Sequence, residues 1–430
     1  MTGPLSGVKV LEASQIVAGP VSGVSLSDFG ADVVKLEPPG GEATRILGAF
    51  VPGESKAYHA LNRGKRSLVI DLHQPEGQAT VHRLIEGFDV FIVNSRPGVP
   101  QRLGIDYETL SSHRPDLIYM ENTGYGSRGP SAARSGSDII AQAYSGLMAG
   151  DGKVDQSGAP TLITSTAPAD FTAGLAGAMG ICAALYHRAL TGEGQYLTTT
   201  LLGAALTLQN VFVSELPAVD AIIRDPMLER VNEVRQAGGS YQDILDARGD
   251  AFSIVGGAFR LYYGGYNVSD GAVIVGALTD ANRAQVREVM GIENDPSEDP
   301  EFNALDPENQ RAVEAVGEQI RAVMLTRTMD EWVAAFDAAG APVSKVSLPE
   351  EMAQDPQVEE MGFLVDLEHD LTGPERMVGP ILEMSGTPLV AERASPPLDA
   401  HTDEVLAEHG FTADEIAGLR SSKAIGGGAV

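Results

Sequence analysis

The chain has 430 residues, 43% of them hydrophobic, and a formal net charge of −29 at pH 7. This length suffices for two or three domain-sized units, and the acidity excludes nucleic acid as a partner because phosphates require a basic surface. A single cysteine, Cys182, excludes an internal disulfide, and its apolar neighbours predict a buried thiol. No signal peptide and no stretch long and apolar enough to span a bilayer is found, so we expect a cytoplasmic protein with no membrane partner.

The first third of the chain alternates short β-branched runs with helical patterns such as Pro75–Phe88. This βα alternation predicts an α/β fold whose large, Rossmann-like domain has a mostly parallel sheet with helices on both faces. Ligands of such sheets bind beyond the carboxyl ends of the strands. The expected strands are Val8–Leu11, Asp32–Leu36, Ser67–Leu72, Asp89–Val93 and Leu117–Asn122.

Two helices rich in small residues follow, Ser137–Ala149 and Pro168–Ala189, and then a strand at Gln195–Leu201. Further on, the pattern changes to a hairpin-like section at Val255–Gly276 and helices between Ala281 and Phe336. We expect a first part of the large domain at 1–215 and a smaller α+β domain at 225–335.

Asp170 lies at the start of the second small-residue helix. Pro168 near the helix entry places Asp170 in the first turn, where backbone N–H groups lack partners and the helix dipole is positive. We expect this field to favour the ionised carboxylate. Asp is common at helix starts as an ordinary cap. An ionised Asp beside a glycine-lined space can also attack an activated acyl carbon and form a mixed anhydride.

Other cofactor chemistries lack their sequence signals. A dinucleotide-binding fingerprint would place G-x-G-x-x-G after the first strand, but that turn runs from Ala13 to Pro20, and Pro20 has no N–H to donate. This argues against a nicotinamide-dependent dehydrogenase, and no P-loop is found. The 8 histidines have no ligand spacing, so a metal site is not expected.

Short motifs spread from end to end carry the strongest functional signal. They are Pro4–Glu12, Ala18–Pro20, Gly30–Glu37, Asn62–Ser67, Asn94–Gly98, Arg102–Gly104, Pro168–Asp170, Thr191–Tyr196, Asp355–Val358, Ser385–Pro388 and His401–Leu406. In this order the chain resembles the family III CoA transferases, the group of formyl-CoA transferase and crotonobetainyl-CoA transferase, which also contains the alpha-methylacyl-CoA racemases.

The resemblance implies roles for particular residues. Asp170 would be acylated during turnover. Asn94, Arg96 and Arg102 would hold the CoA adenine and phosphates, with Ile70 and His73 flanking the nucleotide. Coenzyme A or acyl-CoA would be a substrate rather than a tightly bound cofactor. Residues 343–430 would return to the large domain, and two subunits would interlock in a homodimer.

The acyl pocket is expected to differ from those of the two best-known activities. The family's racemases have a His where this chain has Ser137, in Gly136-Ser137-Asp138, and racemisation needs two acid–base groups. Formyl-CoA transferase has Tyr and Gln at the positions of Ser137 and Val17. Asp138 is expected to orient the helix start or a substrate group.

We therefore expect CoA transfer from an acyl-CoA to a small carboxylic acid through an aspartyl anhydride and an aspartyl-CoA thioester. The oxyanion donors are expected from the backbone at Ala18 and Gly19 and from a Gly256-Gly257 loop. The alternatives are an isomerase that moves CoA within one dicarboxylate, an alpha-methylacyl-CoA racemase, and a non-catalytic acyl-CoA binding protein.

Overall fold

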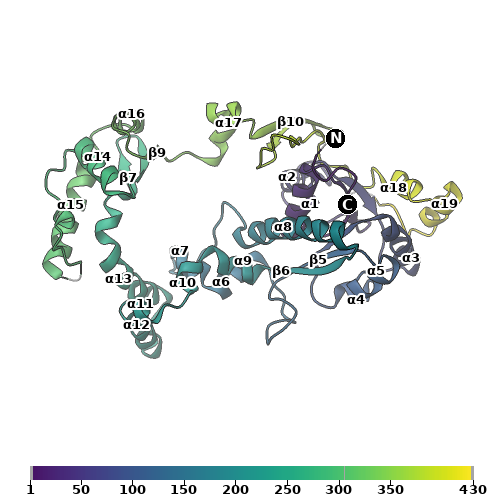
Figure 1. The fold of residues 1–430 in the computed structure, drawn as a ribbon, viewed down its shortest axis with the longest axis horizontal. Coiled ribbons are helices and arrows are strands. Elements are labelled where there is room, and N and C mark those ends of the chain that lie inside the picture. Colours follow the sequence, from purple (N-terminus) through teal and green to yellow (C-terminus); the bar gives the residue numbers. More distant parts are fainter. Residues whose placement is uncertain (1–2, 305, 428–430) are drawn as a thin grey trace. The chain divides into compact units, whose positions relative to one another are not determined.

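The structure is a computed structural model that describes residues 3–304 and 306–427, with side chains described except at 250–256. The chain forms two compact units (Figure 1). Unit 1 comprises Met1–Lys153, Thr161–Val213 and Pro356–Val430, and unit 2 comprises Val154–Pro160 and Ser214–Asp355.

Unit 1 is built around a six-stranded sheet in the order β3-β2-β1-β4-β5-β6, in which all pairs are parallel. The strands are β1 (Lys9–Ala13), β2 (Asp32–Glu37), β3 (Arg66–Val69), β4 (Val90–Val93), β5 (Ile118–Thr123) and β6 (Gln195–Thr200). A separate antiparallel hairpin joins β10 (Leu364–His369) and β11 (Gly373–Val378). The predicted α/β class with a mostly parallel sheet is confirmed.

Helices connect and flank these strands. In unit 1 they are α1 (Ala18–Asp28), η1 (Ala43–Arg45), α2 (Lys56–Asn62), α3 (Pro75–Leu84), η2 (Ile85–Gly87), α4 (Val99–Arg102), α5 (Tyr107–His113), α6 (Asp138–Ser145), α7 (Leu147–Asp151), α8 (Pro168–Thr191), α9 (Leu201–Leu208), α10 (Asn210–Val213), α17 (Pro356–Glu360), α18 (Thr402–Glu408) and α19 (Ala413–Ser421). The single helix expected at Ser137–Ala149 is two, because Gly146 adopts φ 86° and ends α6.

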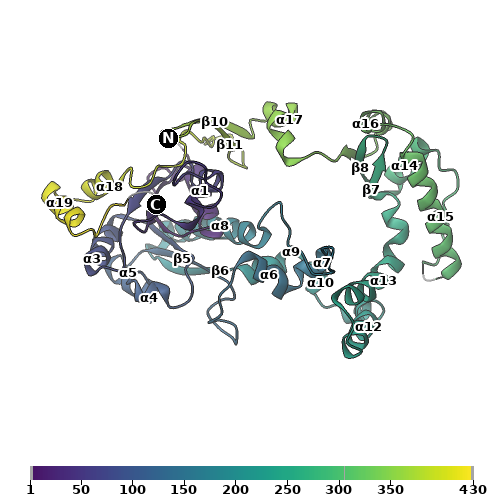
Figure 2. The same ribbon diagram turned by 180° about the vertical axis from the view of Figure 1, so that it is seen from behind.

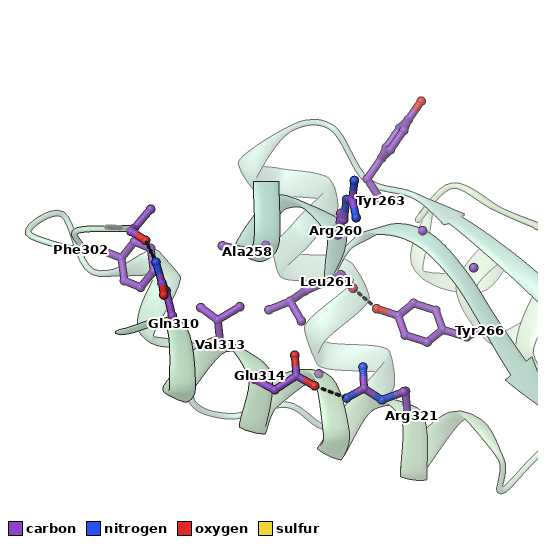
Figure 3. A pocket seen from close by; sticks show the side chains of 15 residues that line it. Ala258, Arg260, Leu261, Tyr263, Tyr266, Phe302, Gln310, Val313, Glu314 and Arg321 are labelled. Atoms are coloured by element: carbon purple, nitrogen blue, oxygen red, sulfur yellow. Dashed lines mark hydrogen bonds and ion pairs between the residues drawn. The ribbon is translucent and has the colours of Figure 1, made fainter. Parts of the chain in front are cut away.

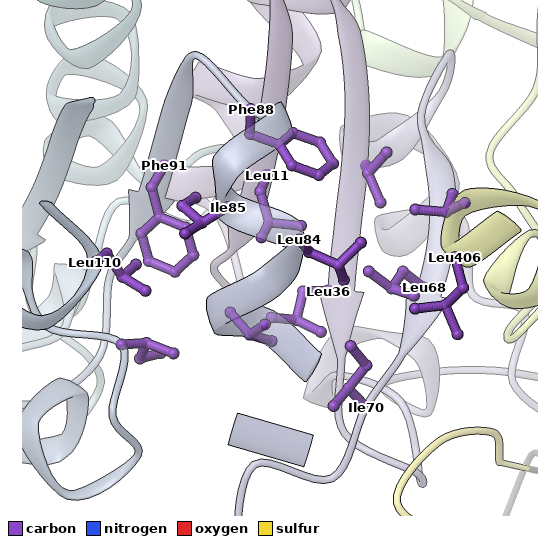
Figure 4. Packing of buried hydrophobic residues seen from close by; sticks show 14 of the residues in the cluster. Leu11, Leu36, Leu68, Ile70, Leu84, Ile85, Phe88, Phe91, Leu110 and Leu406 are labelled. Atoms are coloured by element: carbon purple, nitrogen blue, oxygen red, sulfur yellow. The ribbon is translucent and has the colours of Figure 1, made fainter. Parts of the chain in front are cut away.

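The sheet is covered on both faces because consecutive strand residues point to opposite sides. On one face Leu11 and Phe91 pack with Leu84 of α3 and Leu406 of α18 (Figure 4). The two C-terminal helices α18 and α19 lie on the side of α3 in both views of the chain (Figures 1 and 2). On the other face Val10 packs with Leu26 of α1 and Ile181 of α8.

Helices α1 and α8 approach each other closely through small residues. The Ser22 hydroxyl donates to the Gly174 carbonyl at 2.7 Å. A Cβ at Gly174 would lie 2.5 Å from the Ala18 carbonyl oxygen, so only glycine fits there. By length and composition α8 could cross a membrane, which corrects the expectation that no such stretch exists. In this fold its buried residues pack against α1 and the sheet.

Unit 2 combines helices with a three-stranded sheet in the order β7-β8-β9. Its elements are α11 (Pro217–Asp220), α12 (Arg224–Gln236), α13 (Tyr241–Arg260), β7 (Tyr263–Val268), β8 (Gly271–Gly276), α14 (Asp280–Met290), η3 (Pro296–Glu298), α15 (Pro307–Met324), α16 (Met329–Ala339), β9 (Val343–Lys345) and η4 (Pro349–Gln354). Strand β9 pairs with β8, so Val343–Lys345 belong to the small sheet rather than to the returning segment expected at 343–430.

Gly174→Ala is expected to lower the free energy of unfolding by about 2 kcal/mol, because the added methyl group meets backbone atoms of α1. The matched control is Gly180→Ala in the same helix, where the nearest atom is the end of the Leu197 side chain, at 3.3 Å. Because Ala is the better helix former, the control is expected to be neutral or stabilising. Urea unfolding of the two variants measures the difference. Equal stability of the two would contradict the packing described for Gly174.

Candidate active site

The starts of three helices meet in unit 1. Ala18 begins α1, Ala141 lies in the first turn of α6, and Ala169 lies in the first turn of α8, and these residues share one buried cluster with Leu201 of α9. Small side chains allow the helix ends to come close together. The sequence-predicted residues Ala18, Asp138 and Asp170 are therefore brought to one place.

Asp138 supplies the cap that α8 lacks in its own sequence. Ala167 at the N-cap of α8 has no side-chain hydrogen bond. The Asp138 Oδ1 instead accepts from the backbone N–H groups of Ala169, at 2.8 Å, and Asp170, at 3.2 Å. A carboxylate at a helix N-terminus satisfies N–H groups that would otherwise have no partner. Asp138 of α6 thus fixes the backbone that carries Asp170.

Gln142 holds Asp138 in this position. One turn further along α6, its side-chain amide donates to Asp138 Oδ2, and its amide oxygen accepts from the Ile163 N–H at 3.2 Å. Gln142 is fully buried, so both ends of the amide have a fixed partner.

The charge state of Asp170 differs from the expectation. Burial, and to a smaller extent the nearby Asp138 charge, together raise the pKa of the Asp170 carboxyl to about 7. The helix dipole was expected to keep this group ionised, but Asp138 already occupies the N–H groups and adds a negative charge. A strongly shifted carboxyl at the convergence of helix starts is typical of a functional group.

The turn after β1 is held beside this cluster by buried ion pairs. Lys35 donates to Glu12 at 2.9 Å and to the Ser14 carbonyl at 3.0 Å. Glu42 accepts from the Ile16 N–H at 2.8 Å, and Ile16 has a left-handed φ of 70°. A β-branched residue in this conformation is strained and persists only where its surroundings enforce it.

This turn leaves free donors at the start of α1. Val17 is the N-cap, and the N–H groups of Ala18 and Gly19 have no hydrogen-bond acceptor among the described residues. Gly19 is required because a Cβ there would lie 2.2 Å from Ser14 Cβ. The two N–H groups can therefore stabilise a negatively charged oxygen.

The residues expected to bind CoA lie at the carboxyl ends of β3 and β4, but not all are free. The Asn94 amide donates to the Gln15 carbonyl at 2.7 Å and accepts from the Gln15 N–H at 2.9 Å, so it supports the turn after β1. The Ile70 side chain is 1% exposed in the core, and its part in flanking a nucleotide stays a prediction. His73 is exposed.

Several arginines at this end of the sheet have no acidic partner. Within the described part of unit 1, Arg96 and Arg102 are exposed and form no ion pair, and the same holds for Arg128 and Arg134 after β5. In a chain with 59 acidic and 30 basic residues, an arginine without a carboxylate partner is available for an anion.

Gly256 and Gly257 do not form a loop. Both lie within α13, whose start has a capping box between Ser240 and Asp243.

Gly257 lines a cavity of about 650 Å³ in unit 2, between the end of α13, β7 and α15 (Figure 3). In this cavity the Tyr266 hydroxyl donates to the Leu261 carbonyl at 2.6 Å and Arg321 pairs with Glu314 at 2.6 Å. The part of Gly256 and Gly257 in an oxyanion hole stays a prediction.

The spacing of the histidines in the sequence did not predict that two of them lie together in a buried cluster. One atom each from Glu54, His59 and His369 lie within 4.8 Å of one another, close enough to bind a metal ion. His369 Nδ1, however, accepts from the N–H groups of Leu371 and Thr372, so the proton of the neutral ring is on Nε2, facing Glu54. His369 Nε2 lies 3.5 Å from Glu54 and has no hydrogen-bond partner among the described residues, and coordination of a metal there would need the Nε2 lone pair to be free.

The chain matches the model of CoA-transferase family III over residues 5–402. It is 35% identical to the succinate–glutarate CoA-transferase of Agrobacterium fabrum, with 94% of this chain and 95% of that protein covered. It is 30% identical to the succinyl-CoA:mesaconate CoA-transferase of Haloarcula hispanica, with 95% and 97% covered. A solved CAIB/BAIF family protein from Brucella suis superposes with a TM-score of 0.72 at 29% identity, covering 95% of this chain and 100% of that one. The chain therefore belongs to CoA-transferase family III and is an enzyme that transfers CoA.

Proposed function

We propose that the enzyme moves CoA from an acyl-CoA to a dicarboxylic acid, with Asp170 as the nucleophile. The observation that carries this proposal is the position of Asp170 in the first turn of α8. Asp138 accepts from its backbone N–H, and the preceding residue Ala169 shares a buried cluster with Ala18 at the start of α1. The names of the relatives supply the substrate class, since they transfer CoA between succinate and glutarate or mesaconate.

The proposed reaction proceeds through two anhydrides and one thioester on Asp170. The Asp170 carboxylate attacks the donor thioester carbonyl, and the carbon–sulfur bond breaks to give an acyl–aspartyl anhydride and CoA thiolate. The thiolate attacks the aspartyl carbonyl, which releases the donor acid with one Asp170 oxygen and leaves aspartyl-CoA. The acceptor carboxylate then displaces the thiolate, and the thiolate attacks the acceptor carbonyl to give the new acyl-CoA and free Asp170. The N–H groups of Ala18 and Gly19 are the proposed donors to each oxyanion.

The environment of Asp170 supports this role. A carboxyl with a pKa of about 7 is ionised in half of the molecules near neutral pH, and its carboxylate is more basic than an ordinary Asp. The Asp138 carboxylate already accepts hydrogen bonds from α8 and from Gln142, and Ser137 offers only a hydroxyl, so neither residue supplies a second base for racemisation. An isomerase that moves CoA within one acid would use the same nucleophile.

We also propose a homodimer. On α8, one exposed face carries Met179, Tyr186 and Leu190, whose exposed fractions are 71%, 69% and 69%. An apolar face of this kind on a core helix fits a protein contact better than solvent.

Light scattering at micromolar concentration is expected to give twice the 45.1 kDa chain mass. A mass of one chain would contradict the dimer.

Asp170→Asn is expected to abolish CoA transfer, because the amide keeps the volume of the side chain but is not a nucleophile. CoA binding is expected to stay within about tenfold, or roughly 1.4 kcal/mol, because phosphate recognition lies elsewhere. Steady-state transfer assays and calorimetric CoA titration measure the two effects. The matched control is Asp151→Asn, an exposed acid of α7, which is expected to leave both unchanged. Near-normal transfer by Asp170→Asn would exclude the nucleophile role.

Asp138→Asn is expected to shift the pH dependence of transfer. In the wild type kcat/KM falls as pH decreases through the Asp170 pKa of about 7, because the nucleophile becomes protonated. An Asn can still accept the two N–H bonds but removes the negative charge, so the Asp170 pKa falls. The acidic limb of the profile is therefore expected to move to lower pH by about one unit. An acidic limb that stays in place would show that Asp138 does not set the Asp170 pKa.

A further inference from the structure

The loop between β5 and α6 holds an arginine against two tyrosines. The Arg134 guanidinium lies 5.5 Å from the ring centres of both Tyr125 and Tyr144. The two rings meet edge to face with centres 5.0 Å apart, and the Tyr144 hydroxyl is 3.3 Å from Ser131 Oγ. We call these three side chains the arginine–tyrosine box. Attraction to the faces of aromatic rings restricts a guanidinium while leaving its N–H groups free.

Two polar groups of the box lack partners. Arg134 forms no ion pair with any described residue, although acidic residues outnumber basic ones by 59 to 30 in the chain. The Tyr125 hydroxyl is buried and has no hydrogen-bond partner in the described structure. A buried hydroxyl without a partner is uncommon and costly. One added anion could accept from both the guanidinium and the hydroxyl.

The chain links this box by a few residues to Asp138, which caps α8. Gly124 at the end of β5 and Gly136 before α6 touch so closely that a Cβ on Gly124 would lie 2.7 Å from the Gly136 Cα. This contact closes the loop at its base. Arg134 is four residues before Asp138, so the Cα atoms of Arg134 and Asp138 are within about 14 Å even in an extended chain. Asp138 in turn caps α8 at Asp170. Ser137 between them has an exposed, small side chain.

We propose that Arg134 determines substrate specificity by binding the second carboxylate of the dicarboxylic acyl group, with the Tyr125 hydroxyl as an additional donor. This inference rests on the proposed transfer of CoA between dicarboxylates at Asp170. The planar guanidinium matches a carboxylate with two parallel hydrogen bonds, and its tyrosine faces lower the cost of removing water. A phosphate of CoA offers the same oxyanion chemistry, and the test separates these two sources.

The test measures binding without turnover. Asp170→Asn protein is titrated calorimetrically with glutaryl-CoA and with pentanoyl-CoA, whose acyl chains have equal length and differ in the terminal carboxylate. We expect glutaryl-CoA to bind at least about tenfold more tightly, as for a charge-assisted hydrogen bond. Adding Arg134→Met is expected to remove this preference, and Arg134→Lys to retain part of it. The matched control is Arg311→Met in α15, where the arginine is exposed and pairs with no acid in the described part of the chain.

A preference for glutaryl-CoA that survives Arg134→Met would overturn the proposal, as would the absence of any preference before the change. A second titration compares CoA with dephospho-CoA. If Arg134→Met weakens both acyl-CoAs equally and removes the preference for CoA over dephospho-CoA, Arg134 binds a phosphate instead and the proposal fails. Because these titrations need no transfer, their outcome is independent of whether wild-type enzyme transfers CoA to glutarate, which tests the proposed function itself.

Discussion

The contact between Asp138 and the first turn of α8 is the interaction on which the candidate site depends. It joins α6 to α8 through two N–H groups and places one negative charge beside another. Neither helix supplies this arrangement alone, because α8 has no side-chain cap of its own. The same contact therefore fixes the position of Asp170 and adds to burial, the larger cause, in raising the Asp170 pKa. Asp138 is thus both the cap of α8 and a charge that acts on the proposed nucleophile.

Rigidity around this contact comes from two further sources. Glycine and alanine residues let α1 and α8 pack closely, and the Ser22–Gly174 hydrogen bond fixes their alignment. Buried charges hold the turn before α1, where Glu12 pairs with both Lys35 and Lys65, at 2.9 and 2.6 Å. Removing one partner of such a network would leave a buried charge unpaired. The resulting loss of stability is larger than the stability that the ion pair itself contributes. The turn that carries the free N–H groups of Ala18 and Gly19 is therefore held in place before a substrate binds.

Much of the fold could be predicted from the sequence, because β-branched runs and helical periodicity are local signals. The strands β1 to β6 lie within one to three residues of the expected runs. Features that depend on distant residues could not be predicted. The Asp170 pKa is set by burial and by a carboxylate 32 positions away, and His59 meets Glu375 across 316 positions. The two glycines at 256 and 257 indicated a loop, yet the helix that starts at the Ser240 capping box runs through them.

In the proposed reaction Asp170 exchanges an oxygen atom with the acids at every turnover. This exchange is tested most directly by supplying an acceptor acid whose carboxylate carries the heavy stable isotope of oxygen, and then measuring the mass of the peptide that contains Asp170. We expect heavy oxygen in the Asp170 carboxyl after turnover and in no other residue, because the acceptor oxygen stays on the aspartate when the last anhydride opens. Complete transfer of CoA with an unlabelled Asp170 peptide would contradict this expectation.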